Sequence, residues 1–256
     1  GLSPGNSSTD GVFIDEQLVE EGDWTGPGAA RTILRRQDVE VAVLEAARGG
    51  ILRRGLGVES CQAALVTNVA NDHLGEYGIH TVPQMAEAKG VVYDVVSADG
   101  LCVFNGDDEN TRALGQTKQG DKLFFSVHGK TPFLQERQSL GDELLFVEDG
   151  LIKHLHGETE GVVFAINECP LSMQGTALYN VANILGAVGL ALALQLPQEA
   201  IIKALRSFGS SWQDNPGRGQ LTRLNDIQIL LDFGHNPHGV SAVLQMAHDL
   251  LAQQNQ

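Results

Sequence analysis

The chain has 256 residues, enough for one large domain or for one domain and part of another. It carries 17 basic and 32 acidic side chains, a formal net charge of −15, so nucleic acid is not an expected partner. No apolar run approaches the roughly 20 residues that span a bilayer, and the opening residues do not resemble a signal peptide. Its three cysteines lack C-x-x-C spacing and are expected to be buried reduced thiols. These features predict a cytoplasmic protein with no membrane partner.

Short apolar runs that end in polar residues predict the strands of a sheet. They cover residues 39–44 (VEVAVL), 63–66 (AALV), 101–104 (LCVF) and 227–231 (IQILL). Near-continuous apolar strands are typical of a parallel sheet covered on both faces. Residues 123–170 differ, because FFSV, LLFVEDGLIKHL and GVVFAI read as strands around a hairpin turn at 148–150. A small antiparallel elaboration is expected there.

Helical patterns lie between these runs. Thr81 and Pro83 indicate an N-cap followed by proline in the first turn of a helix that ends near Gly100. A second helix follows the apolar spacing of residues 178–192, and a third runs from 197 to about 208. The alternation of strands and helices predicts an α/β fold with a largely parallel sheet flanked by helices.

The segment 210–219 (SSWQDNPGRG) is rich in turn-forming residues and is expected to link two domains. The residues after it predict one strand and one helix, too few to fold alone. We therefore expect a main domain over residues 1–215 and the truncated start of a second domain over 216–256.

Polar residues at the strand ends are the first candidates for chemistry. Ligands of open parallel sheets bind beyond the carboxyl ends of the strands. Glu45, Asp72, His73, Asp107 and Asp108 all follow a predicted strand. Loops after strands are polar in any protein, so this position alone is a weak signal.

Lys89 carries a sharper signal, because it lies on the apolar face of its predicted helix. It could extend along that face to solvent. Alternatively, it could be a desolvated lysine with a lowered pKa. A neutral amine can react with carbon dioxide to give a carbamate, whose oxygens suit Mg²⁺.

Several motifs in order carry a resemblance to a known family. The stretch VTNVANDHLGEYGIHTVPQMAEAKGVVYDVV resembles the Mur ligase and folylpolyglutamate synthase pattern. The stretch VLEAARGGILRRGLG looks like the Mur-like domain of cyanophycin synthetases. TGPGAAR, FNGDDENTRAL, LYNVANILGAVGLALAL and LLDFGHNPHG continue the match over nearly the whole chain. The resemblance implies a Mur ligase central domain followed by part of a Rossmann-like C-terminal domain.

The same resemblance implies roles for particular residues. Glu45 would bind the Mg²⁺ that bridges the ATP phosphates, and His73 with carbamylated Lys89 would bind a second Mg²⁺ and so act in catalysis. Asn68 belongs to the Thr-Asn pair of the pattern and would contact substrate. The implied nucleotide-contacting residues are Asn180, Asn183, Arg218, Asp232, His235 and Asn236. For Asn180 and Asn183, the alternative is that they only supply polar groups at the start of a helix.

Arg48 is followed by two glycines directly after a strand. Glycine lets the backbone approach a ligand closely, and arginine pairs bidentately with a carboxylate or phosphate. We favour binding of a substrate carboxylate, with a solvated basic patch as the alternative.

The implied reaction is ADP-forming amide-bond synthesis with ATP and Mg²⁺. A substrate carboxylate takes the γ-phosphoryl group to give an acyl phosphate, which an amine then attacks. The expected partners are an amino acid and a carboxylate-bearing peptide or polymer, and homo-oligomerisation stays open. Cyanophycin synthetases join arginine to an aspartate side chain with such a domain, but nothing in this sequence specifies those substrates.

The phosphate-binding loop G-x-x-x-x-G-K-[ST] of the family is not found in the sequence. Gly129-Lys130-Thr131 lacks the earlier glycine, and Pro132 is expected to prevent the following helix. SPGNSST at the start could be a degraded loop, but the preferred alignment places GNSSTDGVFI after the loop and its helix. We expect weak or no ligase activity from this stretch alone. A non-catalytic Mur-like module and a nucleotide-binding regulatory module are the alternatives.

Overall fold

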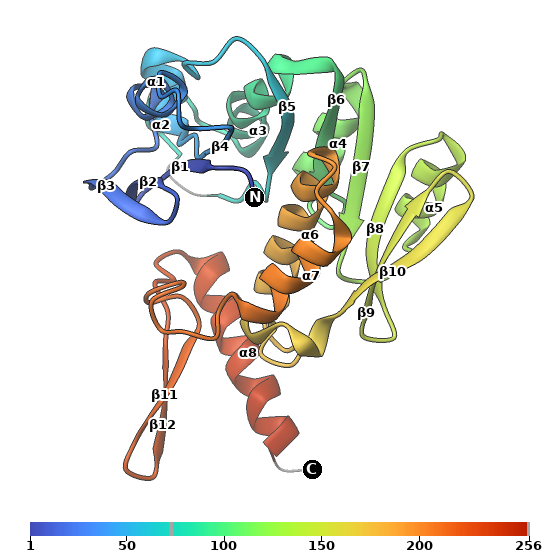
Figure 1. Cartoon of the computed structure of the whole chain (residues 1–256). Coiled ribbons are helices and arrows are strands. Elements are labelled where there is room, and N and C mark those ends of the chain that lie inside the picture. Colours follow the sequence, from blue (N-terminus) through green and yellow to red (C-terminus); the bar gives the residue numbers. More distant parts are fainter. Residues whose placement is uncertain (72–73, 255–256) are drawn as a thin grey trace. The chain divides into compact units, whose positions relative to one another are not determined.

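The computed structural model describes residues 1–71 and 74–254 (Figure 1). Asp72 and His73 lie outside the described residues. The chain divides into two compact units, one formed by residues 1–61 and 73–97 and the other by 62–72 and 98–256. The boundary expected between 215 and 216 stays a prediction. Within the described residues, no helix combines the length and the apolar character needed to cross a bilayer.

The first unit is built on a four-stranded sheet with the order β3-β2-β1-β4. β1 pairs antiparallel with β2 and parallel with β4, and α1 packs on both β1 and β4. Val12, Ala29 and Ile33 form the centre of its small core. Because 4–8 is a paired strand, the interpretation of SPGNSST as a degraded phosphate loop is wrong. The elements are β1 (Pro4–Ser8), β2 (Gly11–Ile14), β3 (Gln17–Glu21), β4 (Val41–Leu44), α1 (Pro27–Leu34) and α2 (Arg48–Arg54).

The helix α3 (Val82–Gly90) also belongs to the first unit and begins as expected. Thr81 accepts a hydrogen bond from the backbone N–H of Gln84, whose side chain in turn accepts from the backbone N–H of Thr81. The expected end near Gly100 is wrong. The helix stops at Gly90 and continues as a short 3₁₀ turn, η1 (Val91–Val95), because the β-branched valines that follow favour the strand that starts at 96.

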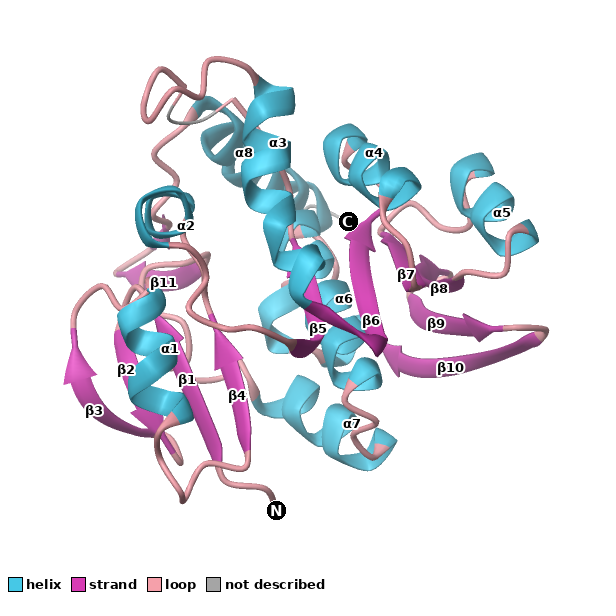
Figure 2. Ribbon diagram, turned by 90° about the horizontal axis from the view of Figure 1, so that it is seen from above, coloured by secondary structure: helices cyan, strands magenta, loops and turns pink. Residues whose placement is uncertain are grey.

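The second unit contains a six-stranded sheet with the order β10-β9-β8-β7-β6-β5 (Figure 2). β6, β7 and β8 run parallel, and β9 and β10 extend the sheet in antiparallel fashion. The predicted hairpin turn is confirmed, because Asp149 and Gly150 both have positive φ (51° and 74°), as a tight two-residue turn requires. The first three residues of FFSV, expected in the antiparallel part, instead lie in the parallel strand β7. The strands are β5 (Cys61–Val66), β6 (Val96–Asn105), β7 (Asp121–Ser126), β8 (Glu143–Glu148), β9 (Leu151–His156) and β10 (Thr159–Ala165).

Helix α6 (Leu178–Ala193) packs against this sheet and supplies much of the core. Its glycines allow close approach, since a Cβ on Gly189 would lie 2.8 Å from a methyl group of Val103. α5 (Pro132–Ser139) starts at the proline that was expected to prevent it, because proline lacks only an N–H that a first turn leaves unpaired. The remaining elements before residue 208 are α4 (Glu109–Thr117), η2 (Ile166–Glu168), η3 (Pro170–Ser172) and α7 (Gln198–Ser207).

The last part of the second unit is a hairpin of β11 (Gln220–Leu224) and β12 (Ile227–Leu231) followed by α8 (Pro237–Gln254). The expected linker at 210–219 contains turns but no helix or strand. The expectation of a single strand here is wrong. The run 227–231 forms a strand as predicted, but it is largely exposed and pairs antiparallel, so it is not a doubly covered parallel strand. The α/β class and the largely parallel sheet flanked by helices are otherwise confirmed.

Candidate active site

In the first unit, the parallel strands β1 and β4 bring two chain segments together at their carboxyl ends. The backbone N–H of Glu45 donates to the carbonyl oxygen of Ser7 at 3.0 Å. Its side chain is exposed, and its Oε2 accepts from the backbone N–H of Thr9 at 3.3 Å. The Glu45 carboxylate therefore lies at the carboxyl edge of a parallel strand pair, the position that the sequence predicted for it.

Arg48 begins α2 and is oriented by the turn at residues 75–78. Its side chain is only 11% exposed, and Nη2 lies 2.5 Å from Oε2 of Glu76. The guanidinium also lies 5.6 Å from the ring centre of Tyr77, and the guanidinium of Arg53 lies at the same distance. Tyr77 itself has φ of 52°, an uncommon conformation for a residue other than glycine. Arg48 thus contacts a carboxylate of the protein itself, and a substrate carboxylate would have to share or replace Glu76.

Lys89 lies in the last turn of α3 and is half-buried. Met85, one turn earlier on the helix, is 2% exposed. Carbamylation of Lys89 stays a prediction. The third residue of the expected metal set, His73, lies outside the described residues.

In the second unit, the loop after β5 is held in place by side chains at the end of β6 and just after it. The side-chain amide of Asn105 donates to the carbonyl oxygen of Thr67 at 2.8 Å, and that of Asn110 donates to the carbonyl oxygen of Val69 at 3.1 Å. The backbone N–H of Val69 donates to Oδ2 of Asp108 at 3.0 Å. Both neighbours of the exposed Asn68 are therefore anchored, which fixes the backbone that presents this side chain.

The two aspartates predicted after β6 have structural partners. Oδ1 of Asp108 caps α4 by accepting from the backbone N–H of Thr111 at 2.8 Å. Asp107 accepts from the hydroxyl of Ser126 at 2.6 Å and from the backbone N–H of Val127 at 2.8 Å. Both carboxylates fasten the carboxyl edge of the sheet. Sequence reasoning missed the anchoring roles of Asn105 and Asn110, although their presence in the stretch FNGDDEN was a usable signal.

At the start of α6, the two predicted asparagines differ. Asn180 is 3% exposed, and its side-chain amide donates to the carbonyl oxygen of Leu171 at 3.0 Å. It therefore holds the turn before the helix. Asn183, which follows three residues later, is exposed to solvent.

Asp232 ties the linker to the end of β12. Its Oδ2 accepts from the backbone N–H of Gly219 at 2.8 Å and from the hydroxyl of Tyr179 at 3.3 Å, while Oδ1 accepts from the backbone N–H of Gly234 at 2.7 Å. Burial, together with the charge of Asp232, raises the pKa of Tyr179 far above its ordinary value, so the phenol is a stable donor. Sequence reasoning missed Tyr179.

The other two residues of the DFGHNP stretch lie beside the start of α8. His235 is exposed, and its Nδ1 lies 3.2 Å from the carbonyl oxygen of Phe233. Oδ1 of Asn236 accepts from the backbone N–H of Gly239 at 2.8 Å, which is the bond of an N-cap residue.

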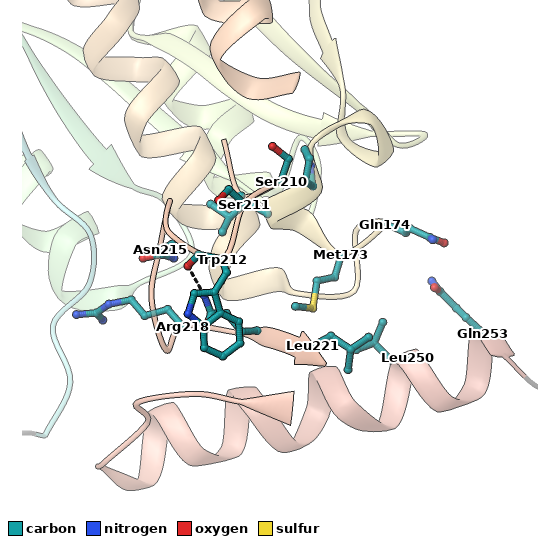
Figure 3. A pocket seen from close by; sticks show the side chains of 15 residues that line it. Met173, Gln174, Ser210, Ser211, Trp212, Asn215, Arg218, Leu221, Leu250 and Gln253 are labelled. Atoms are coloured by element: carbon teal, nitrogen blue, oxygen red, sulfur yellow. Dashed lines mark hydrogen bonds between the residues drawn. The ribbon is translucent and has the colours of Figure 1, made fainter. Parts of the chain in front are cut away.

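A pocket of about 460 Å³ lies between the linker, the turn at 170–174 and the end of α8 (Figure 3). Trp212 and Arg218 line it, and both are exposed. The side-chain amide of Gln220 donates to the carbonyl oxygen of Trp212 at 2.7 Å and so steadies this wall. Arg218 is a predicted nucleotide-contacting residue, and here it borders a cavity that its linker helps to form.

The family of the chain follows from its match to the Mur ligase middle domain, which covers residues 23–191. The chain belongs to this family. Among its relatives, it is 42% identical over 95% of its length to a cyanophycin synthetase of Crocosphaera subtropica, and 39% identical over 95% of its length to that of Synechocystis sp.. It spans about 28% of the length of each.

The fold agrees with solved Mur ligases. A UDP-N-acetylmuramoyl-L-alanyl-D-glutamate–2,6-diaminopimelate ligase matches with a TM-score of 0.65 and 20% identity, over 96% of this chain and 48% of that one. MurF from Acinetobacter baumannii matches with a TM-score of 0.57 and 22% identity, over 82% of this chain and 43% of that one. At these identities, the likeness concerns the fold alone.

Proposed function

We propose that this chain forms the central part of an ATP-dependent, ADP-forming amide-bond ligase of the cyanophycin synthetase kind. The carboxylate of Glu45, exposed at the carboxyl edge of the β1–β4 pair, is the observation that carries the proposal. The 42% sequence identity to a cyanophycin synthetase over 95% of the chain supports this class of reaction. The substrates would be an amino acid and a carboxylate-bearing peptide or polymer, with ATP as phosphoryl donor.

The donor set fits Mg²⁺, because this ion prefers carboxylate oxygens and keeps several waters. Glu45 offers an exposed carboxylate, and Lys89 offers a half-buried amine that a carbamate would convert into an oxygen ligand. When bound, Mg²⁺ would neutralise charge on the phosphate oxygens. The chain's own residues would position the reactants: Arg48 would hold a substrate carboxylate now represented by Glu76, and Asn68 would contact the acceptor from its anchored loop.

The nucleotide would be contacted from the second unit. Asn183, His235 and Arg218 are exposed and can reach a ligand. Asn180, Asp232 and Asn236 would act from behind them, because each already makes a hydrogen bond that fixes a local turn or helix start. In this proposal, the exposed members contact ATP, and the other three keep their surroundings rigid.

A replacement experiment tests the proposal. The matching segment of the Crocosphaera subtropica synthetase is exchanged for this chain, and ADP release and amide formation are measured with arginine and an aspartyl peptide. We expect activity that depends on both substrates. A soluble hybrid that binds Mg²⁺-ATP and forms no amide would refute the ligase proposal and favour a non-catalytic or regulatory module.

Two variants of the active hybrid test the metal-binding roles. Lys89→Ala should lower the rate by more than about tenfold, the size of effect that loss of a metal-supporting group produces. Short carboxylates added to the assay should partly restore it, whereas an unchanged rate would exclude the carbamate. Glu45→Gln should raise the Mg²⁺ concentration needed for half-maximal rate, and Glu20→Gln, an exposed residue of β3, is the matched control.

A further inference from the structure

A second cluster of ligand-type side chains lies on the antiparallel extension of the sheet in the second unit. Glu143 is the first residue of β8, and His154 and His156 are near the end of β9. Nε2 of His154 lies 2.8 Å from Oε2 of Glu143, and Nδ1 of His156 lies 3.0 Å from Oε1 of the same residue. The three ligand-type atoms all lie within 4.8 Å of one another.

Strand geometry explains why these side chains converge. Residues two apart on a strand point to the same face, so His154 and His156 share a face of β9. The register pairs Leu144 with Leu155, which places Glu143 opposite His156 one step further along the ladder. Because Leu144, Leu145 and Leu155 are buried, the backbone that carries the cluster is anchored in the core.

The cluster is accessible and chemically suited to a cation. The side chains of Glu143 and His154 are 21% and 22% exposed, and that of His156 is 71% exposed. One oxygen of the Glu143 carboxylate faces each imidazole, so all three side chains converge on one point. Lys153, the nearest cation in sequence, is paired with Glu148 and Glu160.

We propose that Glu143, His154 and His156 form a binding site for a divalent transition-metal ion, with Zn²⁺ the best match. Two imidazoles and a carboxylate are typical ligands of Zn²⁺, which takes a fourth ligand from water or another molecule. The set differs in kind from an Mg²⁺ site, which requires oxygen ligands in an octahedron. The ion would join the start of β8 to the end of β9 and so clip the open end of the hairpin. This site is independent of the proposed ligase function.

The test uses the whole chain after treatment with a chelator. Co²⁺ is titrated in as a spectroscopic substitute for Zn²⁺, because four-coordinate Co²⁺ absorbs strongly in the visible range. Zn²⁺ is then added in competition. The variants are His156→Ala, whose exposed side chain can be removed with little effect on packing, and Glu143→Gln. The matched control is His128→Gln, an exposed histidine of the same unit outside the cluster. Circular dichroism confirms that each variant is folded.

We expect the wild-type chain to give the visible bands and Zn²⁺ to abolish them. His156→Ala and Glu143→Gln should each weaken the affinity by at least about tenfold, the loss that removing even a supporting group of a metal site causes. His128→Gln should bind as the wild type does. Absence of the bands from the wild-type chain would overturn the proposal, as would equal affinity of His156→Ala and the wild type.

Discussion

The anchoring of the loop after β5 can be tested by replacing Asp108, whose two carboxylate oxygens have separate partners. Oδ1 caps α4 through the backbone N–H of Thr111, and Oδ2 accepts from the backbone N–H of Val69, a residue that is 3% exposed. Asp108→Asn keeps an oxygen for the cap and places the NH2 of its side-chain amide, which cannot accept a hydrogen bond, toward Val69. The buried N–H then lacks an acceptor, which costs about 1–3 kcal/mol. Asp108→Ala should cost about 1 kcal/mol more, because the cap is lost as well.

Hydrogen exchange at the amide of Val69 is the appropriate assay, because two compact units need not unfold together and exchange reports local opening. A loss of about 1–3 kcal/mol corresponds to roughly fivefold to 150-fold faster exchange. Asp99→Asn, an exposed position on β6, is the matched control. If Asp108→Asn protects Val69 as well as this control does, Asp108 does not anchor the loop.

Three further predictions concern the packing of the second unit. Gly189→Ala should lower the thermal midpoint, because its Cβ would lie 2.8 Å from Val103 and overpacking costs about 1–3 kcal/mol. Burial raises the pKa of Tyr179, so the stabilisation from its neutral phenol is complete below pH of about 10 and lost only as the pH rises further. Tyr179→Phe should therefore not change the tyrosinate absorbance that develops as the pH is raised to about 11. Asp142→Asn should cost about 3–5 kcal/mol in urea unfolding, because Arg137, 8% exposed, would lose its buried partner.

Each of these predictions has an outcome that contradicts it. Gly28→Ala, at a helix position with open space around it, should stabilise the protein slightly. An equal gain at Gly189 would contradict the close packing. A smaller tyrosinate step in Tyr179→Phe would mean that this phenol ionises normally. Asp38→Asn breaks an ion pair with Arg36 whose side chains are 41% and 56% exposed, and it should have little effect. A comparably small effect at Asp142 would show that the buried pair is not important for stability.

Local signals located the ends of the predicted strands and the start of α3, but not the end of α3. The cap at Thr81 and the turn at Asp149-Gly150 depend on a few adjacent residues, and both are confirmed. The end of α3 was misplaced because the valines after Gly90 continue an apolar spacing that fits a helix or a strand. Strand pairing depends on residues distant in sequence, so the direction of β12 and the place of β7 could not be read from either run alone.

The sequence predicted where the candidate residues lie in the fold, but it did not predict what each side chain does there. Glu45 follows a parallel strand as expected, and the Asp107-Asp108 pair also follows its strand. The structure separates the two aspartates from Glu45. Both aspartates accept hydrogen bonds that hold neighbouring loops in place. Arg48 was expected to await a substrate, but its pairing with Glu76 depends on a turn that no spacing rule would indicate.

The carboxyl edge of a parallel sheet needs polar side chains for two purposes. Loops that leave the edge expose backbone groups that must be paired, and ligands bound there need donors and charge. Asparagine and aspartate serve both needs, so residue type cannot separate them. The exposure of the side chain can separate them. Asn105 and Asn180 are 7% and 3% exposed, and both donate to nearby carbonyl oxygens. Asn68 and Asn183 are exposed to solvent. If the exposed asparagines contact substrate or nucleotide in a ligase, substitutions at Asn68 and Asn183 should change its kinetic constants and leave its stability unchanged. Substitutions at Asn105 and Asn180 should instead lower the free energy of unfolding first.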